Sequence, residues 1–161
     1  MRGRTILSVL IGLISLACAL VVPTGTAQGA GARPTVCLPF TATGVGQDMG
    51  GGRTTATISV GNHRIGSTEA SFTIGEVTGT VASFAGPLTF RPDRVRGTLV
   101  AQLTGTVDLA TGRFAAASTS ISGTGRLSRV TGDVRIEGVQ DLSSGAFTET
   151  LTGRLCVQGR P

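Results

Sequence analysis

The chain has 161 residues, a formal net charge of +5 and 25 glycines, and it contains no Trp and no Tyr. Its 14 cationic residues are all arginine, a bias typical of GC-rich bacterial genes, and they are dispersed along the chain. Dispersed cations without aromatic stacking platforms argue against nucleic-acid binding. The missing Trp and Tyr also argue against carbohydrate binding.

The first 32 residues have the pattern of a secretory signal peptide. Arg2 and Arg4 precede an apolar run over 6–22, and small residues follow it. This order of cationic start, apolar core and small-residue cleavage region is typical of an exported chain. The run of about 17 residues is at the lower limit for spanning a bilayer, and no basic cluster follows it. We therefore predict cleavage after Ala32, with Ala27 as the alternative site, and one domain over 33–161 without a membrane span. The expected location is outside the cell or on the exterior of its envelope.

Cys18 lies late in the apolar run, where a lipid-modified cysteine can stand. The residues before it, Ser15-Leu16-Ala17, lack the aliphatic residue that the lipoprotein pattern needs three positions before the cysteine. The apolar run also continues past it. We therefore expect a passive signal-peptide cysteine and no lipid anchor.

Removing the signal leaves two cysteines, Cys37 and Cys156, near the two ends of the domain. Two cysteines in an oxidising compartment allow one pairing. The sequence therefore predicts a Cys37–Cys156 disulfide.

The domain reads as all-β from Pro34 onward. Turn-forming residues recur at the spacing, roughly eight to twelve positions, that is typical of short antiparallel strands, and no window has a capped apolar helical period. Apolar residues alternate with polar ones in the first three expected strands. The alternating sets are Val36, Leu38, Phe40 and Ala42, then Ala56, Ile58 and Val60, then Ala70, Phe72 and Ile74.

The segments between these strands carry no recognisable chemistry. The run Gly50–Gly52 lacks the Gly-Lys-Ser/Thr ending of a phosphate loop, so we expect a flexible loop there. His63, the one histidine, stands in a Gly-Asn-His-Arg sequence that is typical of a hairpin turn. A lone histidine without an acidic cluster argues against a metal site. We expect neither a metal nor a cofactor.

The segment over 91–96, Arg-Pro-Asp-Arg-Val-Arg, is the densest cationic patch. It is typical of a solvated turn. Alternatively, Arg94 and Arg96 bind an anionic head group at the mouth of a barrel.

The clearest strand signal follows, over 95–109, where every odd position is apolar or glycine. This period of two predicts one strand. Because it is longer than an ordinary strand, we expect a bend or bulge at Gly97 or Gly105.

A short repeat follows. The segment over 105–114, from Gly105 to Phe114, recurs 33 residues later over 138–147. Each copy places an Asp, Asp108 or Asp141, before a tight turn that ends at a glycine. We expect the two aspartates to form these turns.

The last strand, ending near Val157, places Cys156 opposite its apolar phase, as the first strand places Cys37. If these strands are neighbours, the disulfide joins the seam of a sheet that closes on itself. Closure removes both exposed edges. We therefore predict an all-β fold with an antiparallel closed barrel of about eight strands, and a β-sandwich is the alternative.

The segment Gly-Thr-Gly-Arg-Leu-Ser-Arg-Val-Thr-Gly over 123–132 resembles the G-T-G-x-[FL]-x-x-[AV]-[TS]-G segment of the allene oxide cyclase and dirigent barrels. The resemblance covers roughly residues 95–157. It implies an eight-stranded antiparallel barrel with a central apolar cavity. It does not carry the function over, because the acidic and aromatic residues of dirigent cavities have no clear match here.

Glu149 is the one candidate site residue in the last strand. It lies on the apolar phase between Phe147 and Leu151, so a regular strand directs its carboxyl into the interior. A buried carboxylate needs a partner or stays protonated, and in a cavity it can bind a ligand or transfer a proton. Alternatively, a bulge or the barrel rim places Glu149 in water, or an arginine pairs with it.

Three functional hypotheses follow. The leading one is a non-catalytic exported barrel that binds a small apolar ligand or contributes a surface interaction. The second is an enzyme of the barrel cyclase or isomerase kind, in which Glu149 assists proton transfer. The third is a structural or interaction module of the envelope with a filled core. A cavity lined by Glu149 favours the first two, and a solid interior favours the third.

Overall fold

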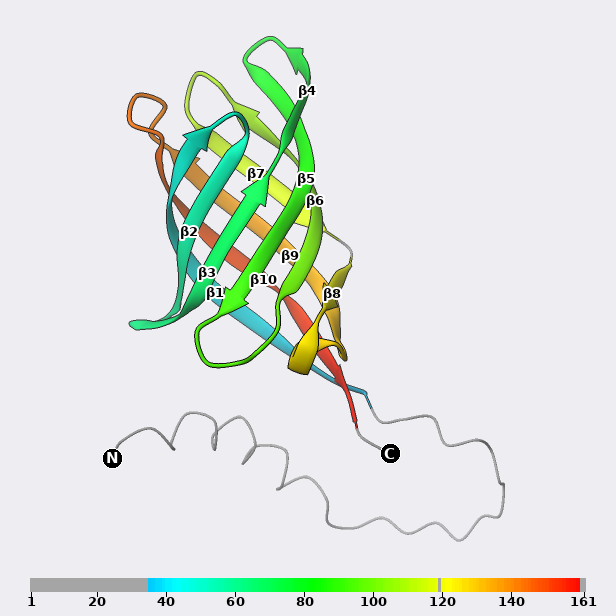
Figure 1. Cartoon of the computed structure of the whole chain (residues 1–161). Helices are drawn as coiled ribbons and strands as arrows, with labels where there is room; N and C mark the ends of the chain where they lie inside the picture. The colour runs from blue at the N-terminus through cyan, green and yellow to red at the C-terminus, as the bar shows by residue number, and fades with distance from the viewer. Residues whose placement is uncertain (1–34, 119, 160–161) are drawn as a thin grey trace, which may run out of the picture. The chain divides into compact units, whose positions relative to one another are not determined.

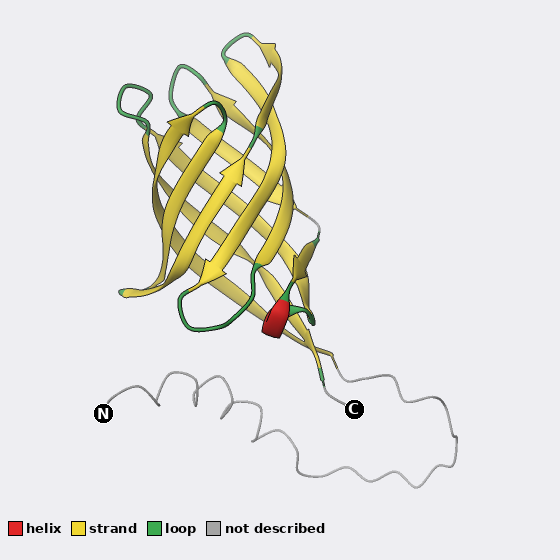
Figure 2. Cartoon of the chain, viewed as in Figure 1, coloured by secondary structure: helices red, strands yellow, loops and turns green. Residues whose placement is uncertain are grey.

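The computed structural model describes residues 35–118 and 120–159, so the predicted signal peptide and Cys18 lie outside it. In these ranges the chain forms one antiparallel sheet with no α-helix (Figures 1 and 2). The elements are β1 (Thr35–Gly50), β2 (Arg53–Val60), β3 (His63–Ser71), β4 (Thr73–Thr78), β5 (Val81–Pro92), β6 (Leu99–Asp108), β7 (Arg113–Ser118), β8 (Ile121–Gly123), the 3-10 turn η1 (Gly125–Leu127), β9 (Val130–Gln140) and β10 (Ala146–Gln158).

The sheet closes on itself. Its strand order is β4-β5-β3-β2-β1-β10-β9-β7-β6-β8, and β5 also pairs with β6. Eight strands therefore form a closed ring, while β4 extends the β5 hairpin and β8 adds a short ladder to β6. The predicted antiparallel closed barrel is confirmed, and closure leaves no free edge along the ring.

The first and last strands form the seam. β1 and β10 pair from Thr35 opposite Gln158 to Gln47 opposite Ala146. Cys37 faces Cys156 in this register, and the two form the predicted disulfide with a sequence separation of 119. Closing a loop of this length contributes about 4–5 kcal/mol in the chain-entropy account. The disulfide therefore secures the strand pair with the largest sequence separation.

Different connections between strands lie at the two ends of the barrel (Figure 1). The upper end holds the turns β1–β2, β4–β5, β6–β7 and β9–β10. The lower end holds the β2–β3 turn, the loop from β5 to β6, and η1. No helix in the described ranges is both long enough and apolar enough to cross a membrane.

Inside the barrel, phenylalanine rings lie against glycines of the neighbouring strand. In the sheet register, Phe84 faces Gly105, Phe114 faces Gly138, Phe147 faces Gly46 and Phe40 faces Gly153. At each of these glycines a Cβ would collide with the facing ring or the backbone beside it. Glycine is therefore required at these interior positions because another side chain already fills the space.

The strand predicted over 95–109 begins later than expected. β6 starts at Leu99, and residues 95–98 belong to the loop that leads into it. Gly97 has φ 129°, which breaks the extended backbone, and the Arg126 N–H donates to the Arg96 carbonyl at 3.0 Å. Of the two glycines where we expected a bend, Gly97 holds it. Gly105 instead accommodates the Phe84 ring.

The two repeated turns form as predicted. The Oδ1 atom of Asp108 accepts from the Ala110 N–H at 2.8 Å, and that of Asp141 accepts from the Ser143 N–H at 2.8 Å. The closing glycines, Gly112 and Gly145, have φ 69° and 74°. Hydrogen bonds to Ser143 and Ser144 lower the pKa of Asp141 to about 2. These aspartates are therefore turn formers with their carboxylates already engaged.

The expected flexible loop at Gly50–Gly52 is instead a tight turn at the upper end of the barrel, and the expected hairpin turn before His63 lies at the lower end. Gly50, Gly51 and Gly52 all have positive φ, and the Gly50 N–H donates to Asp48 Oδ1 at 2.8 Å. They form a tight turn between β1 and β2. His63 begins β3 directly after the β2–β3 turn, as expected for a hairpin.

Replacing Gly138 by Ala should destabilise the barrel, because the Phe114 ring and the Thr148 carbonyl oxygen occupy the space of the new Cβ. Overpacking of this kind costs about 1–3 kcal/mol. Gly75→Ala in β4 is the matched control, since the Ser83 hydroxyl is the one close atom there and can move at the expense of one exposed hydrogen bond to the Glu76 carbonyl, while the next atom is 3.7 Å away. Urea unfolding of the two variants measures the difference. Equal stabilities would show that the Phe–Gly contacts are not constraining.

Candidate ligand-binding site

The barrel interior contains two cavities. The lower cavity has a volume of about 160 Å³ and the upper cavity a volume of about 120 Å³. Thr68 and Leu88 line both, so the cavities adjoin at the middle of the barrel. An eight-stranded barrel has room inside either for side chains alone or for one small ligand. This barrel therefore has interior space beyond what its own side chains fill.

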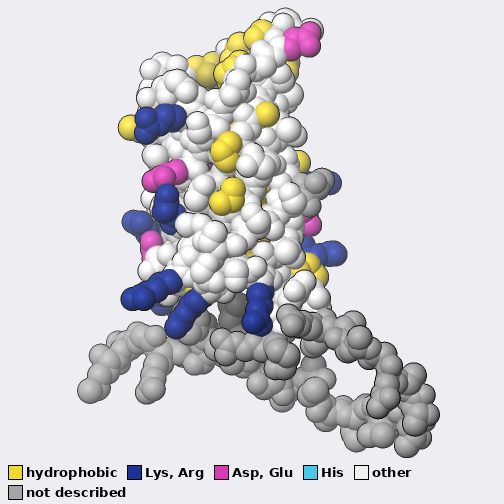
Figure 3. Space-filling view, turned by 45° about the vertical axis from the view of Figure 1, so that its right-hand side comes forward, with side chains coloured by type: hydrophobic (Ala, Val, Ile, Leu, Met, Phe, Trp, Pro, Cys, Tyr) yellow, Lys and Arg dark blue, Asp and Glu magenta, His cyan; other side chains and the backbone are white. Residues whose placement is uncertain are grey.

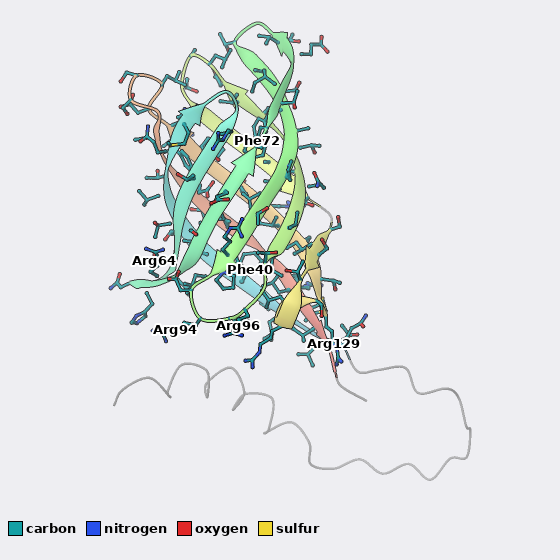
Figure 4. The ribbon with its side chains drawn as sticks, viewed as in Figure 1. Phe40, Arg64, Phe72, Arg94, Arg96 and Arg129 are labelled. Carbon is teal, nitrogen blue, oxygen red and sulfur yellow. A yellow bond between two sulfur atoms is a disulfide. The ribbon has the colours of Figure 1, made fainter. Side chains whose placement is uncertain are left out.

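The lower cavity is apolar throughout. Phe40 and Phe90 line it, and Figure 4 shows Phe40 in the lower part of the barrel. The remaining lining residues are aliphatic apart from Thr68. They are Ala42, Ile58, Val60, Ile65, Leu88, Leu99, Ala101, Ile121, Val134, Leu151 and Leu155. Nothing in this lining is charged.

The upper cavity combines aromatic rings with polar groups. Four phenylalanines line it: Phe72 packs on Phe84 with ring centroids 4.9 Å apart, and Phe114 meets Phe147 edge to face at 6.0 Å. Phe72 is labelled in the upper part of Figure 4. The polar lining residues are Asp48, Thr54, Thr68, Gln140 and Glu149.

Glu149 is the buried carboxyl of this cavity. It lies in β10 on the interior face between Phe147 and Leu151, as the strand phase predicts, and it is 8% exposed. In the described ranges no hydrogen bond or ion pair engages it. Its burial raises the pKa of this carboxyl to about 7, because desolvation disfavours the charged form. Near neutral pH both protonation states are therefore populated.

Gly44 makes room for this carboxyl. Gly44 faces Glu149 in the β1–β10 register, and a Cβ at Gly44 would lie 2.6 Å from Glu149 Cγ. Glu149 therefore stands over a glycine in the way that the neighbouring Phe147 stands over Gly46. The same local arrangement positions a ring at one level and a carboxyl at the next.

Arg94 and Arg96, the other predicted ligand-binding residues, lie far from Glu149. They are exposed on the loop between β5 and β6, at the lower end with Arg64 and Arg129 (Figure 4). Arg64 forms an ion pair with Asp93 at 3.1 Å, but both side chains are largely solvated, so the pair contributes little. The structure therefore separates the three predicted site residues into two ends of the barrel.

The remaining candidate chemistry lies on the surface. His63 is exposed at the start of β3. Within residues 35–118 and 120–159, no group of three His, Cys, Asp or Glu side chains is placed to hold a metal ion.

The four phenylalanines of the upper cavity were not predicted as site residues. The repeat over 105–114 and 138–147 contained a signal for them, because each copy begins with an interior glycine and ends with an interior phenylalanine. Phe114 of the first copy lies against Gly138 of the second. Pairing each aromatic with a glycine on the next strand would have found these contacts.

Comparison with protein-family models finds no match for this chain, and comparison with curated proteins finds no similar sequence.

Replacing Glu149 by Gln should change how stability depends on pH. The folded-state pKa is about 7 against 4.5 for the ordinary value, so the folded protein binds an extra proton between these pH values. Stability should therefore fall as pH rises through this window and level off above it. The shift corresponds to about 3 kcal/mol, which Glu149→Gln should remove. Denaturant unfolding at pH 5 and pH 8 measures it.

Glu137→Gln is the matched control, because Glu137 is an exposed glutamate of β9 facing the neighbouring strand position Thr150. Its pH dependence should follow that of the unmodified chain. If the Glu149→Gln curve also runs parallel to the unmodified one, the carboxyl is not desolvated.

Proposed function

We propose that this chain is an exported, non-catalytic barrel that binds a small apolar ligand in its interior. The observation that carries the proposal is the lower cavity, with about 160 Å³ of space and an apolar lining. Apolar cavities of about 150 Å³ in protein interiors bind molecules such as benzene. The lower cavity is therefore of a size and character that suit a single small hydrocarbon group.

The driving force is burial of apolar surface. A ligand in this cavity gains about 25 cal/mol for each Å² of apolar area removed from water. The closed ring holds the walls in place, so little ordering accompanies binding. A preformed site of this kind favours ligands by shape and hydrophobicity.

Export is supported by two independent features. The sequence begins with a signal-like segment, and the domain contains a Cys37–Cys156 disulfide. Disulfides persist mainly in oxidising compartments outside the cytosol. We therefore place the ligand-binding barrel outside the cell or on the exterior of its envelope.

The third hypothesis, a structural module with a filled core, fits less well. It predicts a solidly packed interior, and the two cavities disfavour it.

Benzene should bind the lower cavity. We expect saturable methyl shifts of Leu151 and Leu155 in NMR spectra when benzene is added, because both residues line this cavity. Ala101→Leu should abolish these shifts by filling the space, since Ala101 is 4% exposed and faces the cavity. Ala116→Leu, which fills the upper cavity instead, is the control and should leave them in place. A folded chain that binds benzene nowhere, or equally well after Ala101→Leu, would contradict the proposal.

A second candidate function is catalysis by Glu149. The observation in its favour is the pKa of about 7 in an aromatic cavity, since a general acid or base works best with a pKa near the operating pH. The reaction would be of the cyclase or isomerase kind, in which shape supplies the rest of the catalysis. Glu149 would then move a proton on a ligand held in the upper cavity.

Hydrogen exchange into a retained ligand separates the two candidates. Native mass spectrometry of the exported, non-reduced protein identifies a co-purified ligand, and the disulfide makes the chain two hydrogens lighter. Incubated in deuterated water, an enzyme should introduce deuterium into that ligand, and Glu149→Gln should stop the exchange. Glu137→Gln should not affect it. Exchange that survives Glu149→Gln would remove Glu149 from the catalytic role, and absence of exchange supports simple binding.

A further inference from the structure

The upper cavity lacks a positive charge to match its carboxyl. Of the described residues that line the two cavities, none is Arg, Lys or His, whereas Glu149 and Asp48 both line the upper one. Asp48 already accepts a hydrogen bond from Gln140 Nε2 at 3.1 Å and caps the β1–β2 turn. Glu149 has no such partner in the described part of the chain. The group that would complement this cavity is therefore a cation or a strong hydrogen-bond donor beside Glu149.

The cost of burying Glu149 is already part of the folded state. Its side chain is 8% exposed, and desolvation accounts for its raised pKa. When a buried ion pair forms, both charges must normally be desolvated, and this penalty can exceed the attraction between them. Here the Glu149 carboxyl is already desolvated in the folded protein. An incoming ammonium group would therefore gain the attraction to the carboxylate, and only the ammonium group would lose its hydration.

The walls around Glu149 suit the same ligand. Phe72, Phe84, Phe114 and Phe147 line the upper cavity. The faces of aromatic rings attract cations, and the attraction is stronger where the contact is desolvated. The rings also offer apolar surface to a hydrocarbon body. Aromatic rings beside a carboxyl are therefore complementary to an ammonium group that carries an apolar substituent.

The distribution of charge along the barrel points the same way. Asp48, Glu76, Asp108 and Asp141 lie at the upper end, and only Arg53 and Arg113 of the described arginines accompany them there. On the face drawn in Figure 3, several basic side chains lie around the lower end and an acidic one lies at the top, with single basic and acidic groups between them. Such a separation of charge steers cations toward the acidic end. A cation therefore meets a favourable field at the mouth nearest Glu149.

We propose that the upper cavity binds a small primary amine, with its ammonium group against the Glu149 carboxylate and its apolar body among the four phenylalanines. This inference rests on the proposed ligand-binding function and specifies the ligand class. A carboxylate ligand is disfavoured, because Glu149 repels it and Arg94 and Arg96 lie at the opposite end. A neutral alcohol is the appropriate comparison, since it shares the shape and lacks the charge.

Butylamine, butanol and butyrate test this selectivity. Each contains four carbon atoms, so the three probes differ mainly in the charge of the polar head group that they bring to the upper cavity. NMR titration at pH 8, where Glu149 is ionised, should show butylamine binding at least about tenfold more tightly than butanol. Butyrate should bind more weakly than butanol. Ala116→Leu should abolish amine binding, because Ala116 lines the upper cavity.

Glu149→Gln should remove the preference for the amine, whereas Glu137→Gln should retain it. Lowering the pH to 5 should remove it in the unmodified chain, because Glu149 is then protonated. Asp48, the other carboxyl lining this cavity, is present in both variants and therefore serves as an internal control. Retained benzene binding in the lower cavity shows that Glu149→Gln is folded.

The outcomes separate the two proposals. Benzene binding together with equal affinity for butylamine and butanol would overturn the amine inference and leave the apolar-ligand proposal standing. Amine binding that depends on Glu149, without benzene binding, would support the amine site and overturn the apolar one. If none of the probes binds the folded chain, both proposals fail.

Discussion

The contact between an interior ring and a facing glycine is the constraint on which this barrel depends. Eight strands enclose a space barely wide enough for the side chains that point into it. An aromatic ring on one strand therefore leaves no room for a side chain at the facing position of the next strand. Phe84, Phe114 and Phe147 meet this condition at Gly105, Gly138 and Gly46. Because each pair spans two neighbouring strands, the pairs also fix the strand register: a slip by one residue would place a side chain where the ring lies. Packing and topology are thus specified by the same residues.

The same constraint explains the cavities and the carboxyl. Where an interior position carries a small residue, as Ala101 does in the lower half and Ala116 in the upper half, the interior keeps unfilled space. Where a long polar side chain takes the place of a ring over a glycine, as Glu149 does over Gly44, an ionisable group is held inside with no hydrogen-bond or ion-pair partner among the described residues. The interior is therefore divided into an apolar half and a half that contains the buried Glu149 carboxyl, although both are built by one rule.

The sequence predicted the fold better than it predicted the site. Period-two alternation, the phase of the two cysteines and the aspartate turns led to the closed barrel, its disulfide seam and its hairpins, because each depends on neighbouring residues or on a single possible pairing. The start of β6 was predicted four residues too early, because alternation persists through residues that Gly97 turns out of the strand. The strand phase also placed Glu149 correctly. The separation of Glu149 from Arg94 and Arg96, and the gathering of four phenylalanines around it, depend on which strands meet across the barrel, and local patterns do not contain this information.

The disulfide has a mechanical consequence. Thr35 and Gln158 lie opposite each other at the outer limit of the β1–β10 ladder, and the Cys37–Cys156 bond lies two residues further in. Tension that enters the barrel through β1 and leaves through β10 is therefore carried by a covalent bond almost at once. The hydrogen bonds of the β1–β10 ladder on the inner side of the disulfide, from Leu38 opposite Leu155 onward, are therefore shielded from this force, as is the rest of the eight-stranded ring. A barrel clamped in this way keeps the shape of its interior while the segments on either side are pulled.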